Sequence, residues 1–402
     1  MNTFETPVGP LSEPLSLHDR LMKITPRPAA VMARGAGSYL WDEAGCRYLD
    51  FIQGWAVNCL GHCPHEVAQA VTAQAQTLIT PSPALHNRPQ LDLAEQLVSV
   101  TGMAQVHFSN SGAEANEVAI KLARKWGRSQ GAGRFRVIST HNGFHGRTLA
   151  TMAASGKPGW DGLFPPYVEG FHKVPFGDLQ AMADAIDGET VALMVEPIQG
   201  EAGVVVPPEG YLQGLRRLAD QHNLLLILDE IQTGFGRTGT LCHFQQVHVT
   251  PDIITLGKGL GGGLPLSATL ANERAAVFEF GDQGGTFNGN PLTTAVGAAV
   301  LNTVNQPEFL ATVRQREAYL VAGLQGLQSV HQIVQVRGCG LLYALVLGAP
   351  LGAEVADYAF QQGLLLNSPR PDVLRLMPSL RVSEAEIDEF LNILDHCLAK
   401  LL

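Results

Sequence analysis

Cysteine, clustered positive charge and long apolar runs are all scarce in this sequence, and each shortage excludes a class of protein. Only six cysteines occur in 402 residues, at no regular spacing, which argues against a disulfide framework and favours a reducing compartment. No apolar run approaches the roughly 18 residues that cross a bilayer. The N-terminus has neither the basic nor the apolar part of a secretory signal. We therefore expect a soluble, cytoplasmic protein without a membrane partner.

The charge balance excludes a further class. The formal net charge is −10, and the Lys and Arg residues form no basic block. Nucleic acid is therefore not an expected partner, because its phosphates demand clustered cations. Hydrophobic residues make up 46% of the chain and charged residues only 16%, which is typical of a protein with a large buried core. The length predicts about two or three domains.

One short stretch has the side chains of a metal site. The segment "CLGHCPH" contains Cys59, His62, Cys63 and His65, and mixed thiolate and imidazole ligands suit zinc. These residues lie close together in the chain, however, and no second ligand pair follows at the spacing of a zinc finger. We therefore expect no metal, and interpret the stretch as a structural turn that leads into the helix "EVAQAVTAQAQTLI".

The order of the expected elements indicates an α/β fold. The segment "GSYLWDEAGCRYLDF" alternates like a β-hairpin with its turn at residues 43–45. Further on, short runs such as "NLLLILDE" and "PDIITLG" are apolar on both faces and alternate with amphipathic segments, which favours a mainly parallel sheet covered by helices. We expect a loosely ordered arm and a hairpin that belong to the small domain (1–50), a large domain (51–295) and a C-terminal small α+β domain (296–402).

Lys258 stands among the glycines of "DIITLGKGLGGGLPLS", directly after an apolar run. A Walker phosphate loop needs Ser or Thr after the lysine, but the chain has Gly259 there. Asp229 ends the preceding apolar run, "LLLILD", and ligands of open α/β sheets bind at the carboxyl ends of the strands. A lysine that forms a Schiff base and an aspartate that pairs with a pyridinium nitrogen are the groups that pyridoxal 5′-phosphate (PLP) requires. Taken alone, Lys258 could be a surface residue and Asp229 a turn or cap residue.

A phosphate site is indicated in "FSNSGAEANEVAIKLARK", where Ser111 and Gly112 stand between a strand and a helix. The free N–H groups and the dipole of a helix N-terminus favour an anion, although ordinary N-capping by Ser109, Asn110 or Ser111 would give the same pattern. The segment "GFGRTG" (234–239) matches a dinucleotide fingerprint only in spacing, because no convincing helix follows it.

Several motifs in order give the chain a more specific interpretation. They are "YLWDEAGCRYLDF", "NSGAEANE", "HNGFHGRT", "VEPIQGEAGV", "LDEIQTGFGRTG", "GKGLGGGLP" and "GNPL". With these motifs the sequence resembles the class III aminotransferases, which are fold-type I PLP-dependent transferases with a large domain and a smaller α+β domain. Within that family it is most similar to the members that act on acetylornithine and ornithine.

The resemblance implies a role for each residue that matches a family motif. Lys258 would bind PLP covalently and carry the proton during catalysis, and Asp229 would keep the ring nitrogen protonated. Thr286 would reach the phosphate of the neighbouring subunit, which implies a homodimer with shared active sites. The remaining cofactor contacts would come from Ser111, Gly112 and Ala113 at the phosphate, Phe144 on the ring face, and Ile231 and Gln232 near the phenolic oxygen.

Substrate recognition in the family depends on arginines that bind carboxylates. By resemblance, Arg147 would bind the carboxylate of the amino donor, and Arg375 the α-carboxylate of glutamate, with Glu201 pairing Arg375 when the other substrate is bound. The sequence departs from its relatives at three positions near the substrate: Thr25 aligns with a common tyrosine, Gly285 with a serine that touches substrate, and Asn288 with a glycine.

The resemblance therefore predicts a transaminase that moves an amino group from an ω-amino donor to 2-oxoglutarate, giving glutamate and a semialdehyde. N-acetylornithine is the leading donor, which implies a place in arginine biosynthesis. Ornithine, succinylornithine and 4-aminobutyrate are alternatives, and a PLP-dependent racemase or decarboxylase is a more remote one. A non-catalytic PLP-binding protein is the alternative from outside the enzymes.

Overall fold

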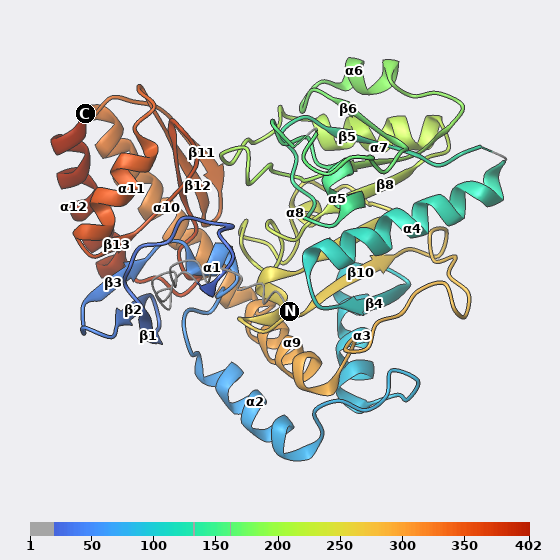
Figure 1. Cartoon of the computed structure of the whole chain (residues 1–402), viewed down its shortest axis with the longest axis horizontal. Coiled ribbons are helices and arrows are strands. Elements are labelled where there is room, and N and C mark those ends of the chain that lie inside the picture. The colour runs from blue at the N-terminus through green and yellow to red at the C-terminus, as the bar shows by residue number, and fades with distance from the viewer. Residues whose placement is uncertain (1–19, 132, 161) are drawn as a thin grey trace, which may run out of the picture.

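The computed structural model of the chain describes residues 20–131, 133–160 and 162–402. All but the last residue of the expected N-terminal arm lies outside these described residues. The chain forms a larger lobe around one sheet and a smaller lobe that contains the C-terminus (Figure 1). None of the helices in the described part of the chain combines the length and apolarity that crossing a bilayer requires.

A seven-stranded sheet forms the centre of the larger lobe, in the order β4–β10–β9–β8–β7–β5–β6. Strand β10 runs antiparallel to both its neighbours, whereas every other pair of neighbours is parallel. The prediction of a mainly parallel sheet is therefore confirmed. The strands are β4 (Gln105–Ser109), β5 (Arg136–Thr140), β6 (Phe171–Val174), β7 (Thr190–Val195), β8 (Leu225–Asp229), β9 (Ile253–Leu256) and β10 (Ser267–Ala271).

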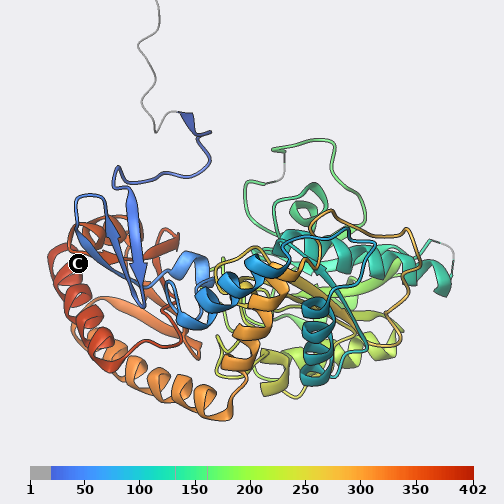
Figure 2. The same ribbon diagram turned by 90° about the horizontal axis from the view of Figure 1, so that it is seen from below.

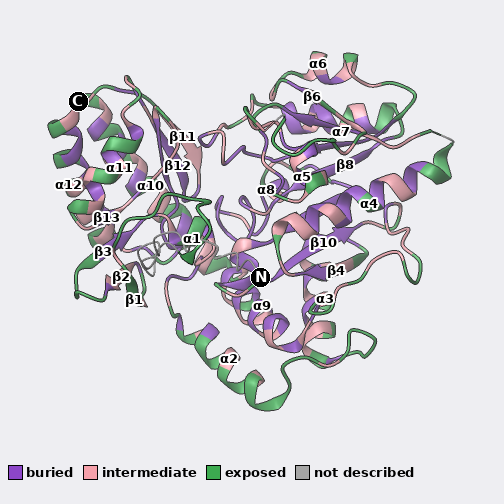
Figure 3. Ribbon diagram, viewed as in Figure 1, coloured by how far each residue is buried: buried purple, intermediate pink, exposed green. Residues whose placement is uncertain are grey.

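Alternate residues of the central strands face helices on opposite sides of the sheet. On β8, Leu225 and Ile227 pack with α4 (Gly112–Gln130), whereas Leu226 and Leu228 pack with α7 (Tyr211–Gln221). Figure 3 shows the resulting buried layer. Because both faces are covered, the strand has a continuous apolar sequence, and polar residues occur only at its carboxyl end. The other helices of this lobe are α2 (His65–Thr77), α3 (Arg88–Thr101), α5 (Leu149–Ala154), α6 (Leu179–Asp184), α8 (His243–Gln246) and α9 (Pro291–Val304).

The smaller lobe combines the two ends of the described chain. Strands β1–β2–β3 form an antiparallel meander, and β13 pairs with β3 in parallel. The predicted hairpin is β2–β3, and its turn lies at the expected residues. Phe51 stacks on Phe390 with 4.1 Å between ring centroids, so the N-terminal hairpin is held against the last helix. The elements are β1 (Met32–Ala36), β2 (Tyr39–Asp42), β3 (Arg47–Asp50), β11 (Ile333–Cys339), β12 (Leu342–Leu347), β13 (Leu364–Leu365), β14 (Asn367–Arg370), β15 (Val373–Leu376), α10 (Pro307–Val330), α11 (Gly352–Gln361) and α12 (Glu384–Leu401).

The division into domains stays a proposal, and we adjust one boundary of it. The expected boundary between residues 295 and 296 falls inside α9, whose buried Val296 and Val300 join the core of the larger lobe with Leu260 and Leu266. We therefore propose that the small domain begins after α9, at residue 305, and includes the hairpin before residue 50.

Glu230, directly after β8, is a buried acid with a structural role. Its carboxylate accepts hydrogen bonds from the backbone N–H groups of His243 (3.0 Å) and Phe244 (2.7 Å), at the start of α8. Burial raises its pKa from the ordinary 4.5 to about 6, although these hydrogen bonds and one from Thr233 act in the opposite direction. The folded chain therefore binds this proton more tightly than the unfolded chain does.

The Glu230→Gln variant should change how stability depends on pH. Stability from the raised pKa is fully present below pH 4.5 and is lost as pH rises through about 6. At roughly 1.4 kcal/mol per pKa unit, the wild type should lose about 2 kcal/mol relative to the variant between these limits. Denaturant unfolding of both cofactor-free proteins at several pH values measures this difference, with the exposed Glu43→Gln as the matched control. The assignment is contradicted if the free energy of unfolding of the wild type, relative to that of the variant, does not fall as pH rises.

Candidate functional site

A cavity of about 250 Å³ opens where the carboxyl ends of the central strands meet the start of α4. It brings together many of the predicted site residues from distant parts of the chain. Those that line it are Gly112, Ala113, Phe144, Arg147, Glu201, Asp229, Ile231, Gln232 and Lys258. The lining also includes residues that the sequence reasoning missed, namely Asn116, His145, Gly146 and Glu196. Lys258 and Asp229 therefore face one cavity, as their strand-end positions indicate.

Lys258 is the first residue of a short 3₁₀ turn, η2 (Lys258–Gly261), which follows β9. Its φ of 45° lies in the left-handed region, where a residue with a side chain is strained by about 1–2 kcal/mol. The glycines around it make the turn possible, because a Cβ at Gly259 would lie 3.0 Å from the Cβ of Phe235. Burial lowers the pKa of the Lys258 amine, although the nearby carboxylate of Glu201 acts in the opposite direction. A larger neutral fraction makes the amine a better nucleophile.

Asp229 is buried and held from three sides. Its Oδ2 accepts hydrogen bonds from Asn116 Nδ2 (2.7 Å) and His145 Nδ1 (2.8 Å), and its Oδ1 accepts one from the Ile231 N–H (3.1 Å). Asn116 is fixed in turn, because its Oδ1 accepts a hydrogen bond from Thr255 Oγ1 (2.8 Å). These contacts fix the direction of the carboxylate, as an aspartate that binds a protonated ring nitrogen requires.

Two further titratable groups stand beside Asp229. Burial by itself would lower the pKa of His145, but the hydrogen bond and charge of Asp229 raise it overall. Its Nε2 atom is buried and has no hydrogen-bond partner among the residues that the structure describes. Burial raises the pKa of Glu196 to about 7, and its carboxylate accepts hydrogen bonds from the Phe144 N–H (2.8 Å) and the Gly200 N–H (3.2 Å). Glu196 thereby fixes the backbone that carries Phe144 into the cavity.

The start of α4 has the geometry of an anion site. Ser111 is the N-cap, and a capping box joins it to Glu114: the Ser111 N–H donates to Glu114 Oε2 (3.0 Å) and the Glu114 N–H to Ser111 Oγ (3.3 Å). The N–H groups of Gly112 and Ala113, in the first turn, have no partner within the helix. A Cβ at Gly112 would lie 2.8 Å from Ile231 Cδ1, so glycine keeps this approach open. Ser111 itself is outside the cavity lining, and its amide is occupied by Glu114.

Arg375 lies behind the cavity rather than in its lining, and it is completely buried. Its guanidinium forms an ion pair with Glu201 Oε1 (2.7 Å) and donates to Gln232 Oε1 (3.1 Å). The Nε and Nη2 groups donate to Asn367 Oδ1 at 3.0 and 2.7 Å. Burial would raise the pKa of Glu201, but the Arg375 charge and then the Lys258 charge lower it overall. The expected pairing of Arg375 with Glu201 is thus present.

Trp55 is another neighbour of Arg375 that the sequence reasoning missed. It lies on the short turn α1 (Gln53–Ala56), in which Gly54, Trp55 and Ala56 all have φ between 60° and 64°. The Arg375 Cζ atom lies 5.7 Å from the centroid of a Trp55 ring. Such consecutive left-handed residues are rare. The contact between Trp55 and Arg375 therefore depends on a strained backbone that no sequence pattern predicts.

Arg147 is exposed in this single chain and lines the cavity. Its Cζ atom lies 5.1 Å from the ring centroid of Trp160. Within the described residues it has no ion pair or hydrogen bond. Its N–H donors are therefore open to a ligand, in contrast to those of Arg375.

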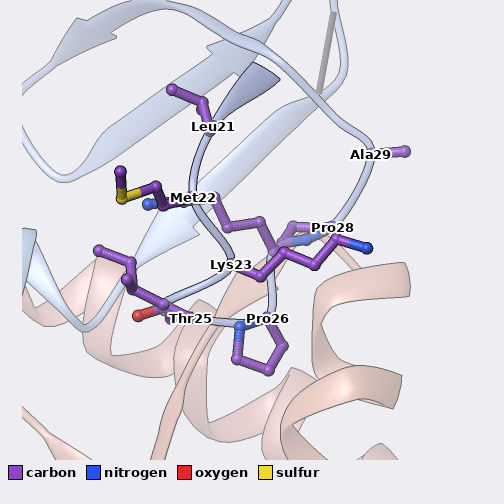
Figure 4. Close-up of a pocket in the computed structure, with 9 residues that line it drawn as sticks. Leu21, Met22, Lys23, Thr25, Pro26, Pro28 and Ala29 are labelled. Atoms are coloured by element: carbon purple, nitrogen blue, oxygen red, sulfur yellow. The ribbon is translucent and has the colours of Figure 1, made fainter. Parts of the chain in front are cut away.

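Thr286, Gly285 and Thr25 do not line the cavity. Thr286 is exposed. Thr25 belongs to the exposed segment 21–29, which runs away from the body of the chain (Figure 2) and encloses a separate hollow of about 640 Å³ (Figure 4). The contribution of these residues to an active site therefore requires a neighbouring chain or a movement.

The departures at Gly285 and Asn288 are structurally linked. A Cβ at Gly285 would lie 2.5 Å from Asn288 Nδ2, so a serine at 285 is incompatible with this position of the asparagine. Asn288 is held there because its Oδ1 accepts a hydrogen bond from Asn110 Nδ2 (2.9 Å). The two departures therefore act as one change next to the start of α4.

The segment "CLGHCPH" is a turn before α2. Within the described residues, no group of three or more His, Cys, Asp or Glu side chains is arranged to hold a metal ion. His62 Nε2 bonds to Asp50 Oδ2 (2.8 Å), and Cys59 Sγ donates to the carbonyl oxygen of Gly259 (3.4 Å). The segment thus supports the backbone that follows Lys258. The stretch 234–239 is a series of turns and forms no helix, so the structure lacks the helix that a dinucleotide fingerprint requires.

Comparison with known proteins agrees with this geometry. A family profile described as aminotransferase class-III matches residues 23–398. The protein named acetylornithine aminotransferase 2 in Bordetella pertussis is 54% identical over 382 residues, which cover 94% of this chain and 96% of the relative. The acetylornithine aminotransferase of Ralstonia nicotianae is 52% identical over 381 residues, which cover 93% of this chain and 96% of the relative.

Solved structures give the same result. The N-acetylornithine aminotransferase of Stenotrophomonas maltophilia matches with a TM-score of 0.82 and 37% identity, covering 93% of this chain and 96% of that one. The ornithine aminotransferase of Toxoplasma gondii matches with a TM-score of 0.90 and 31% identity, covering 95% and 93%. The fold and the lysine–aspartate cavity thus define a fold-type I, PLP-dependent enzyme. More narrowly, the chain belongs to the class-III aminotransferases.

The residues of the cavity fit PLP. The open amides of Gly112 and Ala113 suit its phosphate, the oriented carboxylate of Asp229 suits its ring nitrogen, and the amine of Lys258 suits its aldehyde. Phe144, partly buried in the lining, supplies an aromatic face. The donor set therefore agrees with the cofactor of the family.

Proposed function

We propose that this enzyme transfers the ω-amino group of N-acetylornithine to 2-oxoglutarate, giving glutamate and the corresponding semialdehyde. The observation that carries the proposal is the pairing of one open arginine, Arg147, with one counter-ion-bound arginine, Arg375, beside the cavity that contains Lys258. The acetylornithine aminotransferase names of relatives at 52% to 54% identity support this donor. Arginine biosynthesis is the pathway that this reaction would serve.

In the proposed mechanism, bound PLP would supply the electron sink for breaking the bond between the substrate carbon and its hydrogen. Lys258 would hold the cofactor and afterwards move the proton, and such general acid–base catalysis contributes about 10²–10⁴-fold in rate. Asp229 would keep the ring nitrogen protonated, since Asn116 and His145 hold its carboxylate in place. Gly112 and Ala113, next to the N-cap Ser111, would bind the phosphate, with Ile231 and Gln232 on the phenolic-oxygen side.

Two substrates of different shape must use one cavity in turn. We propose that Arg147 binds the carboxylate of N-acetylornithine while Glu201 neutralises Arg375. When glutamate or 2-oxoglutarate binds, its α-carboxylate replaces Glu201 on Arg375. A planar guanidinium can donate two parallel hydrogen bonds to such a carboxylate. Asn367 continues to hold the other side of the guanidinium, so the arginine does not move while its partner changes.

We further propose that the enzyme is a homodimer with shared active sites, in which Thr286 of one subunit reaches the phosphate of its neighbour. Three apolar side chains of the N-terminal segment support an interface, since Leu21, Met22 and Ile24 are 60%, 87% and 77% exposed. Sedimentation of the purified protein measures the assembly. The six free cysteines support our proposal that it works in the reducing cytoplasm.

A panel of amino donors tests the function. N-acetylornithine, ornithine, N-succinylornithine and 4-aminobutyrate are each mixed with the purified PLP-loaded enzyme and 2-oxoglutarate, and glutamate is quantified. We expect N-acetylornithine to give the highest kcat/KM, with one glutamate formed per semialdehyde. A clear preference for another donor would replace N-acetylornithine by that donor. Consumption of donor without glutamate would refute transamination in favour of a racemase or decarboxylase, and no consumption of any donor would indicate a non-catalytic protein.

A further inference from the structure

Trp160 lies in the loop after α5 and contacts the cavity from outside its lining. Its ring centroid is 5.7 Å from that of Phe144, in an edge-to-face arrangement with an interplanar angle of 64°. Two cations also approach the indole, with Arg147 Cζ at 5.1 Å and Lys157 Nζ at 5.4 Å from the ring centroid. The ring thus joins the aromatic side chain predicted to face the cofactor to the arginine predicted to bind the donor.

The way Arg147 is held differs from the way Arg375 is held. The N–H donors of Arg375 are occupied by Asn367, Gln232 and Glu201. Arg147 has the contact with Trp160 and, within the described part of the chain, no hydrogen bond or ion pair. An aromatic face attracts a guanidinium through its quadrupole without using any N–H donor. The guanidinium can therefore be oriented and still keep its complete set of donors for a carboxylate.

Apolar residues also surround the indole of Trp160. The indole lines a small apolar hollow together with Leu149, Met152 and Phe164, and it is partly buried. This hollow places the indole beside two residues of α5, Leu149 and Met152. A partly buried ring next to the guanidinium can limit the positions of a flexible arginine side chain, which otherwise loses rotamer freedom on binding a ligand.

We propose that Trp160 is a positioning residue for substrate specificity: it holds Arg147 ready, with all its donors open, for the carboxylate of the amino donor. The inference rests on the proposed function, because it assumes that Arg147 receives this carboxylate. Its consequence is selective. Loss of the ring should weaken ligands that carry the carboxylate and leave ligands without it unaffected.

The experiment is a double-mutant cycle with Trp160→Leu and Arg147→Ala on the PLP-loaded enzyme. Binding of N-acetylnorvaline, which keeps the acetamido group and carboxylate but has no reactive amine, is measured by calorimetry. We expect Trp160→Leu to weaken it about tenfold in the wild-type background and not at all in the Arg147→Ala background. Trp160→Phe, which keeps an aromatic face, should lose less. Phe164→Leu removes a ring from the same hollow without touching Arg147 and should bind normally.

A kinetic comparison completes the test. For N-acetylornithine, Trp160→Leu should raise KM and leave kcat nearly unchanged, whereas for N-acetylputrescine, the same donor without its carboxylate, neither should change. Equal weakening of N-acetylnorvaline by Trp160→Leu with and without Arg147, or no binding by the wild type, overturns the inference. Failure of the proposed function is distinguished from this, since it would appear as absence of turnover by the wild type with every donor.

Discussion

The Lys258→Ala variant should lose turnover with every amino donor, by at least about 10⁴-fold, because the change removes both the covalent attachment and the group that moves the proton. The visible absorbance of the lysine-bound cofactor should disappear as well. Binding of PLP should persist at lower affinity, since the contacts predicted from Gly112, Ala113 and Asp229 do not depend on the lysine. Steady-state kinetics and absorbance spectra measure the two losses separately.

The matched control is Lys121→Ala. Lys121 lies on α4 but is exposed, and its amine donates to the carbonyl oxygen of Asp282 (2.7 Å) instead of entering the cavity. This variant should retain wild-type kcat and spectrum. Turnover that survives in Lys258→Ala would show that another group does the chemistry, and the assignment of this lysine would be withdrawn. Alanine keeps the Cβ that strains the φ of 45° at this position, so the change relieves none of that strain.

The sequence predicted best the residues whose position follows from strand order. Asp229 ends β8, Lys258 follows β9, and these strands are parallel neighbours in register, with Asp229 opposite Thr255. Two polar residues at adjacent carboxyl ends must lie near each other in any such sheet. The start of α4 was likewise readable, because a serine and a glycine between a strand and a helix are a local signal.

Site residues that come from other elements could not be predicted in this way. Asn116 contacts Asp229 across 113 positions of sequence, and in isolation it is one more polar residue of an amphipathic helix. A local signal did exist, since Asn116 lies one turn after Gly112 and so on the same side of α4. His145 follows Phe144 in the motif "HNGFHGRT", yet its ring points to Asp229, which only the loop conformation determines.

The departures from the family were seen in the sequence, but their connection was not. Gly285 and Asn288 appear as two separate differences in the sequence, whereas the structure makes them one, because the asparagine amide occupies the space of a side chain at 285. For Thr25, by contrast, the structure of a single chain does not explain the departure. It belongs to a segment that does not contact the cavity within one chain, so its role depends on the proposed dimer.

The Arg375→Ala variant should impair glutamate and 2-oxoglutarate far more than N-acetylornithine. The guanidinium is completely buried and already desolvated, and truncating one partner of such a charge pair costs about 2–5 kcal/mol, or roughly 30- to 4,000-fold. The loss should appear in kcat/KM of the glutamate half-reaction, followed through the cofactor spectrum in single turnovers. The donor half-reaction should change by less than about tenfold, because Arg147 stands in the other position and keeps its donors open.

The reciprocal variant provides a second test of this prediction. Arg147→Ala should weaken N-acetylornithine more than glutamate, so the two variants should give opposite patterns. Arg375→Ala leaves Glu201 and Gln232 without their shared partner, and its thermal midpoint must be measured so that unfolding is not taken for lost binding. Arg375→Lys keeps the charge but loses the planar fork of donors that can hold Asn367 and a carboxylate together, and it should fall between the wild type and Arg375→Ala. If both half-reactions lose equally in Arg375→Ala while the fold is intact, the exchange of Glu201 for a substrate carboxylate cannot be how one cavity accepts two substrates.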